Sequence, residues 1–149
     1  MILKTDGELK DLLANSYRIA MVGLSDKPER ASYKVAQYLL KRGFQVIPVN
    51  PTINQVLGLK AVPTLKDIKG RIDIVNVFRR ADQVMPVTQE AVEMGAKAIW
   101  YQLGVVNEDA AQFASDHGLK VVMDYCIKIE HNRLMVQKKE NLDLHPQFY

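Results

Sequence analysis

The stretch RIAMVGLSDKPERASYKVAQYLL, residues 18–40, decides the fold of this chain. It opens with the short apolar run IAMV, residues 19–22, which has the length of a buried strand. A loop rich in Gly, Ser, Asp and Pro follows over residues 23–31. Ser32 is predicted to be the N-cap of a helix, because apolar residues recur behind it at helical spacing. The stretch therefore predicts a strand, a loop and a helix in succession.

The next residues complete a unit of two strands and one helix. Gly43 is placed to end the helix, and a second strand is predicted over residues 44–49. In β-loop-α-β units of this kind, the first loop and the N-terminus of the helix form an anion-binding site. The question that the sequence raises is which anion binds there.

Composition limits the class of protein. The 149 residues are 48% hydrophobic and 25% charged, which is typical of one soluble globular domain, predicted here over residues 1–149. No apolar run approaches the roughly 18 residues that a membrane span needs. The first 17 residues lack the layout of a signal peptide and predict a capping helix that starts at Thr5 or Asp6. A single cysteine favours a reducing cytoplasm.

The remaining chain alternates strands and helices. Further strands are predicted over residues 72–78, 97–101 and 119–123, with helices over residues 81–94 and from about Asn107. Five short apolar strands that alternate with helices predict a parallel sheet covered on both faces. The fold class is therefore α/β, a three-layer, doubly wound Rossmann-like sheet of five mainly parallel strands. The expected strand order is 3-2-1-4-5. Residues 135–149 are predicted to be a polar C-terminal tail, irregular over LDLHPQFY.

Ligands bind such sheets outside the carboxyl ends of the strands, where the strand order reverses. The residues expected there are Gly23, Leu24, Ser25, Lys27, Arg30 and Ser32 after the first strand, Asn50 and Pro51 after the second, Phe78, Arg79 and Arg80 after the third, Gln102 and Gly104 after the fourth, and Asp124 and Cys126 after the fifth. Each has a plainer explanation as a turn glycine, a cap, a turn residue or a solvated charge. Two adjacent arginines after an apolar strand repel each other unless one faces an anion, and Arg79 is favoured for that role.

The usual dinucleotide site is not encoded. Of the fingerprint G-x-G-x-x-G only Gly23 is present, and Asn50 stands where an acidic residue would bind the ribose hydroxyls. The sequence also lacks the G-x-x-x-x-G-K-[ST] phosphate loop. Side chains as well as backbone must therefore hold the phosphates.

Several runs occur in the order found in a known family: VGLSDKPERAS, VIPVNP, LGLKAVPTLKDI, DIVNVFRR, AKAIWYQLGVVNEDA and GLKVVMDYCIKIEH. The chain resembles the small single-domain CoA-binding proteins, which are similar to the N-terminal CoA-binding domain of the succinyl-CoA synthetase alpha subunit. The resemblance covers about residues 18–134. It implies that Ser25, Lys27, Arg30 and Ser32 hold the phosphorylated ADP half of CoA. It also implies that Asn50 and Pro51 border the adenosine, that Val77, Phe78 and Arg79 line the adenine and phosphate side, and that Trp100, Tyr101 and Gln102 lie near the pantetheine.

The resemblance does not extend to ligase chemistry, because the phosphorylated histidine and the nucleotide-grasp machinery of the synthetases lie in other domains or subunits. The three histidines, His117, His131 and His145, lie at a predicted helix end or in the tail and have no metal partner at a useful spacing. No catalytic residue and no metal ligand is therefore assigned. Cys126 is expected to be a small buried residue, with a mixed disulfide to CoA as the alternative.

The leading hypothesis is a cytoplasmic protein that binds coenzyme A or an acyl-CoA. The alternatives are an NAD(P)-dependent Rossmann oxidoreductase and a CoA-binding module of a multi-subunit acyl-CoA synthetase. A homodimer and a synthetase-type partner subunit are the two partner hypotheses. The formal charge of +3 suits a small polyanion and is too weak to predict nucleic-acid binding. No membrane partner is expected.

Overall fold

The computed structural model describes residues 1–137 of the chain. The elements, in chain order, are α1 (Asp6–Ala14), β1 (Arg18–Val22), α2 (Ala31–Lys41), β2 (Gln45–Val49), β3 (Gln55–Val56), β4 (Leu59–Lys60), η1 (Leu65–Asp67), β5 (Ile74–Val77), η2 (Ala81–Gln83), α3 (Val84–Glu93), β6 (Ala98–Tyr101), α4 (Glu108–Asp116), β7 (Lys120–Met123), α5 (Ile127–His131) and the π-helix η3 (Asn132–Gln137).

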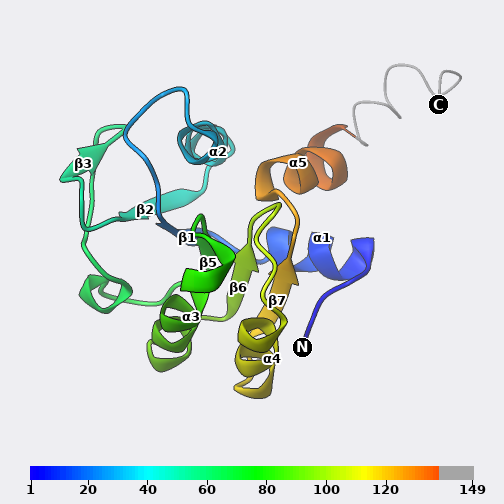
Figure 1. Ribbon diagram of the computed structural model, residues 1–149. Coiled ribbons are helices and arrows are strands. Elements are labelled where there is room, and N and C mark those ends of the chain that lie inside the picture. The colour runs from blue at the N-terminus through cyan, green and yellow to red at the C-terminus, as the bar shows by residue number, and fades with distance from the viewer. Residues whose placement is uncertain (138–149) are drawn as a thin grey trace, which may run out of the picture.

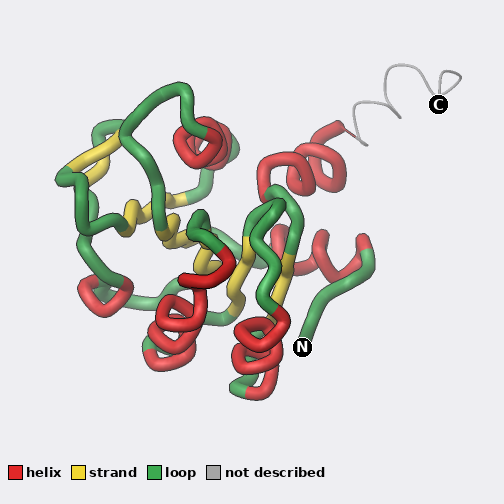
Figure 2. Tube along the Cα trace, viewed as in Figure 1, coloured by secondary structure: helices red, strands yellow, loops and turns green. Residues whose placement is uncertain are grey.

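Five strands form one parallel sheet in the order β2-β1-β5-β6-β7, and β3 pairs with β4 in a small antiparallel hairpin. Figure 1 shows α3 and α4 on one side of the sheet and α1, α2 and α5 on the other. The strands in Figure 2 form the middle layer between the two sets of helices. The predicted fold class, a three-layer α/β sheet with helices on both faces, is confirmed.

The two faces of the sheet carry separate apolar cores because successive side chains of a strand point to opposite sides. In β1, Ile19 and Met21 pack into the core with α1, α2 and α5, whereas Ala20 and Val22 pack into the core with α3 and α4. All residues of β5 and β6 are buried. This double burial is why these strands are almost continuously apolar.

The expected strand order is wrong. Numbered along the chain, the five main strands lie in the order 2-1-3-4-5, because the third strand, β5, pairs with β1 and not with the outer edge of β2. Val62 lies on that outer edge, where its N–H donates to the carbonyl of Pro48 at 3.0 Å. A proline without an N–H belongs on an edge strand, so Pro48 is the sequence signal for this order.

One other sequence prediction needs correction. Ser32 is the second residue of α2 and not its N-cap, which is Arg30 and makes no side-chain capping bond. The segment after Asp124 is helical through α5 and η3, and Leu134 and Met135 pack against the core. The rest of the predicted tail, residues 138–149 with LDLHPQFY and His145, lies outside the described residues.

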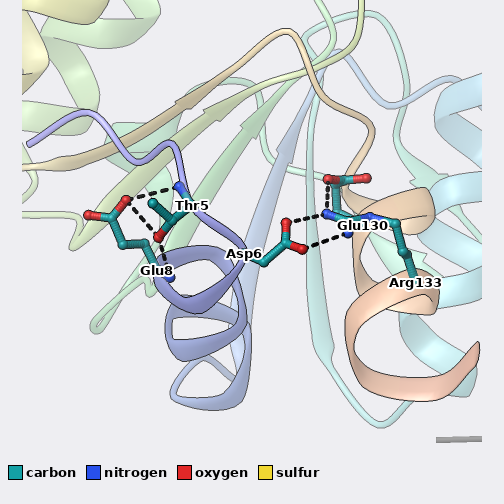
Figure 3. A network of polar contacts seen from close by, with 5 residues as sticks. All are labelled: Thr5, Asp6, Glu8, Glu130 and Arg133. Atoms are coloured by element: carbon teal, nitrogen blue, oxygen red, sulfur yellow. Dashed lines mark hydrogen bonds and ion pairs between the residues drawn. The ribbon is translucent and has the colours of Figure 1, made fainter. Parts of the chain in front are cut away.

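The N-terminal helix is held at its start by two sets of contacts. Thr5 caps α1 and exchanges hydrogen bonds with Glu8 in a capping box, as Figure 3 shows. Arg133 of η3 donates two hydrogen bonds to the carboxylate of Asp6, at 2.9 and 2.8 Å, and a third to Glu130. The ion pair therefore ties the start of α1 to the last described turn of the chain.

Asp73 joins the beginnings of β1 and β5. Its Oδ2 accepts from the backbone N–H groups of Tyr17 and Arg18, at 2.8 and 2.9 Å, and Lys97 and Arg71 lie 3.6 Å from Oδ1. Burial opposes ionisation of this carboxyl, but the two N–H donors and the two cations outweigh it and hold its pKa below the usual value.

Replacing Asp73 with Asn is therefore expected to lower the free energy of unfolding by about 1–3 kcal/mol at neutral pH. A lowered carboxyl pKa stabilises the fold above the unfolded value of about 3.9 and loses this effect as the pH falls below it. Urea unfolding at a series of pH values should show the difference between wild type and Asp73→Asn closing in acid. Glu29→Gln, which removes an exposed carboxylate, is the control. A difference that stays constant with pH would contradict this role.

Candidate functional site

A cavity of about 600 Å³ opens at the carboxyl ends of β1, β2, β5 and β6. From β1 the chain crosses through α2 to β2, and from β5 it crosses in the opposite direction through α3 to β6. The cavity therefore lies at the position where the strand order reverses, as expected for a ligand site in an open parallel sheet. Its volume is in the usual range for small-molecule sites.

Of the fifteen residues expected at the strand ends from the sequence, eleven line this cavity: Gly23, Ser25, Lys27, Arg30, Ser32, Asn50, Phe78, Arg79, Arg80, Gln102 and Gly104. Leu24 and Val77 do not, because their side chains are fully buried in the two cores. Pro51 lines a smaller neighbouring cavity of about 210 Å³, which Arg79 also lines. That these residues bind a ligand remains a prediction.

Gly23 follows β1 and packs closely against Phe78, which follows β5. Its φ is +84°, and a Cβ atom at this position would lie 2.1 Å from the carbonyl oxygen of Phe78. On its other side, the N–H of Gly23 donates to the carbonyl of Val49 at 2.9 Å. Glycine is therefore required by the contact between strands, whether or not a ligand approaches it.

Hydrogen bonds hold the loop after β1 against α2. The hydroxyl of Ser32 accepts from the N–H of Ser25 at 3.0 Å, and the hydroxyl of Ser25 accepts from the N–H of Lys27 at 3.1 Å. The N–H of Arg30 then donates to the carbonyl of Lys27. Both serines thus shape the loop, which brings the loop and the N-terminus of α2 to one wall of the cavity.

Asn50 clamps the loops after β1 and β2 together. Its Nδ2 donates to the carbonyl of Leu24 at 3.0 Å, and its Oδ1 accepts from the N–H and hydroxyl of Thr52. The amide is therefore used by the protein itself, which favours the turn explanation of Asn50 over a contact with a base or ribose.

The cavity carries an excess of positive charge. Among the described residues, the side chains of Lys27, Arg30 and Arg79 have no ion pair, while the carboxylate of Asp26 is the only acidic group that lines the same cavity. Arg80 is different, because its guanidinium donates to Asp82 at 2.8 Å. The N-terminus of α2, with no acidic residue in its first turn, adds partial positive charge. The arrangement suits a polyanion.

Gln102 is buried, at 3% exposure, at the floor of the cavity. Its Nε2 donates to Oδ1 of Asn76, whose Nδ2 donates to the sulfur of Met21 at 3.0 Å. A thioether sulfur can only accept, so it orients the amide of Asn76, and Asn76 in turn orients Gln102. Oε1 of Gln102 has no hydrogen-bond partner among the described residues and is not enclosed by protein, so an acceptor faces the cavity.

Trp100 and Tyr101 are expected near the ligand from the sequence, but both side chains are fully buried. The indole N–H of Trp100 donates to the carbonyl of Tyr125, and the hydroxyl of Tyr101 pairs with that of Thr88. Burial raises the pKa of Tyr101 to about 12. Both residues are part of the core and not of the cavity wall.

Seven further residues, which the sequence did not single out, line the cavity: Asp26, Ala31, Thr52, Ile53, Ala81, Leu103 and Val105. Most lie one to three residues beyond a predicted one, so the position after a strand end is the signal that finds them. Cys126 is half-buried at the N-cap of α5, packs against the core and does not line the cavity.

No helix in residues 1–137 is long and apolar enough to cross a membrane. Within the same residues, no group of three or more His, Cys, Asp or Glu side chains is arranged to hold a metal ion.

This fold, with its cavity at the reversal of strand order, agrees with a family assignment from the sequence. The model of the CoA binding domain family matches residues 17–132, so the chain belongs to that family. It is 51% identical over 124 residues to the protein YneT of Bacillus subtilis (strain 168), covering 83% of this chain and 92% of YneT. A solved structure of a hypothetical protein from Pyrococcus horikoshii OT3 has a TM-score of 0.86 and 38% identity, over 89% of this chain and 93% of that one.

A longer relative is the subunit alpha of acetate–CoA ligase [ADP-forming] II from Pyrococcus furiosus. It is 27% identical over 130 residues, which are 80% of this chain but 28% of that subunit. The chain is thus related to one part of an acetate–CoA ligase subunit.

The close contact at Gly23 leads us to expect that a side chain there destabilises the fold. Gly23→Ala is expected to lower the free energy of unfolding by the cost of a positive φ, about 1–2 kcal/mol, plus about 1–3 kcal/mol for the collision with the Phe78 carbonyl. Gly118→Ala is the matched control, because Gly118 has a φ of +89° and a Cβ there would meet nothing within 4 Å. Urea unfolding of both variants measures the difference. Equal losses would show that no collision occurs at Gly23.

Proposed function

We propose that this protein binds coenzyme A or an acyl-CoA in the cavity at the carboxyl ends of the strands. The observation that carries the proposal is the group of three cations, Lys27, Arg30 and Arg79, which have no ion pair among the described residues and lie beside the N-terminus of α2. CoA carries a diphosphate and a 3′-phosphate, and charge-assisted hydrogen bonds from such cations are the strong kind. Membership of the CoA binding domain family supports the same ligand.

In this proposal the phosphates lie against the loop after β1 and the first turn of α2. The loop is already shaped by the Ser25–Ser32 and Asn50–Leu24 hydrogen bonds, so little ordering is needed on binding. Arg79 lies at the boundary between the main cavity and the smaller one, where it can contact a phosphate from either side. Asp26 repels an anion, and the three cations outweigh it.

Catalysis is not part of the proposal. The related ligase subunit is more than three times longer than the matched part, so its activity does not transfer to this chain. A CoA-binding module that works with a separate synthetase-type subunit is the second form of the same proposal. Capture of a nucleotide-grasp partner on the immobilised protein would support that form, and recovery of the protein by itself would count against it.

Calorimetric titration of the ligand-stripped protein with CoA, NADH and NADP tests the ligand. We expect CoA to bind with a micromolar dissociation constant and both dinucleotides to give no heat above dilution, because the cavity lacks the dinucleotide fingerprint. Binding of a dinucleotide alone would replace this proposal with the oxidoreductase alternative. Absence of all binding would contradict it for the isolated protein.

The two adjacent arginines offer a matched pair of variants. Arg79→Ala is expected to weaken CoA binding by about 1–3 kcal/mol, since it removes a cation that the protein leaves without an ion pair. Arg80→Ala changes the net charge equally, but Asp82 already neutralises this guanidinium, so its effect should be smaller. The dissociation constants for CoA provide the measurement, and equal effects of the two variants would remove the special role of Arg79.

A further inference from the structure

The cavity has two chemically different walls. The wall formed by the loop after β1 and by Arg79 is cationic, whereas the loop after β6 contributes the apolar side chains of Leu103 and Val105. Leu103 is 63% exposed, and Val106, close behind it, is 46% exposed. A run of exposed apolar side chains beside a ligand cavity marks a surface that another molecule covers.

Hydrogen bonds fix the conformation of this apolar loop, residues 103–106. The N–H of Gly104 donates to Oδ1 of Asp124 at 2.7 Å, and the N–H of Val105 donates to the carbonyl of Gln102 at 2.8 Å. At its end, Nδ2 of Asn107 donates to the carbonyl of Ala81 at 2.9 Å. The loop is thus tied to the elements after β5 and β7, and the exposed Leu103 has a defined position against the cavity.

Two more exposed apolar side chains follow Asp124 in the chain. Tyr125 is 42% exposed directly after it, and Ile129 on α5 is 54% exposed. Figure 1 shows the loop between β6 and α4 reaching toward the start of α5, in agreement with the Gly104–Asp124 hydrogen bond.

Gln102 separates the two walls and limits how a ligand can lie. Its Oε1 faces the cavity as an acceptor, and Asn76 and Met21 fix that orientation. A phosphate offers only acceptors at neutral pH, so it is unfavourable beside Oε1. The phosphates therefore belong at the cationic wall, and the opposite end of the ligand belongs at the apolar loop.

We propose that residues 103–106 bind the acyl group of an acyl-CoA, so that the protein selects thioesters with apolar acyl chains over free CoA. The inference rests on the proposed CoA-binding function and adds the class of ligand. Complete burial of a methylene contributes about 0.8 kcal/mol, a factor of about four in affinity. On an open loop, about half of that free energy, a factor of about two per methylene, is expected.

Calorimetric titration of the full chain with CoA, acetyl-CoA, butyryl-CoA, hexanoyl-CoA and succinyl-CoA tests the inference. The dissociation constant is expected to fall about twofold for each methylene from acetyl-CoA to hexanoyl-CoA. Succinyl-CoA has the same four-carbon chain as butyryl-CoA but ends in a carboxylate, so it should bind no more tightly than acetyl-CoA. Equal affinities for all four thioesters would overturn the inference and leave CoA binding intact.

Variants locate the effect. Leu103→Ser should abolish most of the gain in affinity with chain length from acetyl-CoA to hexanoyl-CoA. Tyr17→Ser is the matched control, because Tyr17 is 60% exposed but precedes β1, at the amino ends of the strands and opposite the cavity. It should keep the full dependence on chain length.

Three further outcomes would overturn the proposal. A chain-length dependence that survives in Leu103→Ser assigns the acyl group to another surface. The second outcome combines two results: the wild type shows no dependence of affinity on acyl-chain length, and sedimentation shows that Leu103→Ser has lost self-association. Together they would assign the apolar loop to a contact between copies of the chain. Absence of binding by CoA and by every thioester contradicts the proposed function itself, and this inference with it.

Discussion

The contact between Gly23 and the carbonyl of Phe78 is the constraint on which the site depends. It lies where β1 and β5 run side by side and where their connections leave in opposite directions. A side chain at residue 23 would separate the ends of these strands and change the floor of the cavity. The loop after β1 and Arg79, which follows β5, line the same cavity, so the pairing of these two strands also places the positive charges of the site.

Around this contact, polar side chains form hydrogen bonds that hold the loops, whereas most of the cations of the cavity form no ion pair with the described part of the protein. Ser25, Ser32 and Asn50 bond to backbone groups, and Arg80 is neutralised by Asp82. The three other cations of the cavity make no ion pair among the described residues. Such a division gives a preformed cavity whose charge is not satisfied internally, which is the condition for binding an anion with little reorganisation. The loop at residues 103–106 adds apolar side chains at the side of the cavity away from the cations.

Much of the candidate site is predictable because the rule that places ligands at the carboxyl ends of parallel strands needs only the strand ends. Arg79 follows β5 and Gln102 follows β6, so the rule finds both. The expected residues that do not line the cavity are explained by one cause. Leu24, Val77, Trp100 and Tyr101 lie near the same edge, but the direction in which each side chain points depends on the pleat and on the core that it meets. Helix starts are predicted from local residue types, and serine is a common N-cap, so Ser32 is expected to cap α2. Its hydroxyl instead accepts a hydrogen bond from the N–H of Ser25 across the loop.

The sequence by itself determined the class of fold, the alternation of strands and helices, and the absence of a dinucleotide fingerprint, because these follow from local periodicity and spacing. Only the tertiary structure decided the strand order, since β5 could pair with either side of the first two strands, and the outer edge of β2 is in fact taken by Val62. It alone also decided which cations are without an ion pair. A pair such as Arg80–Asp82 depends on where two side chains meet in space, which local periodicity and spacing do not fix.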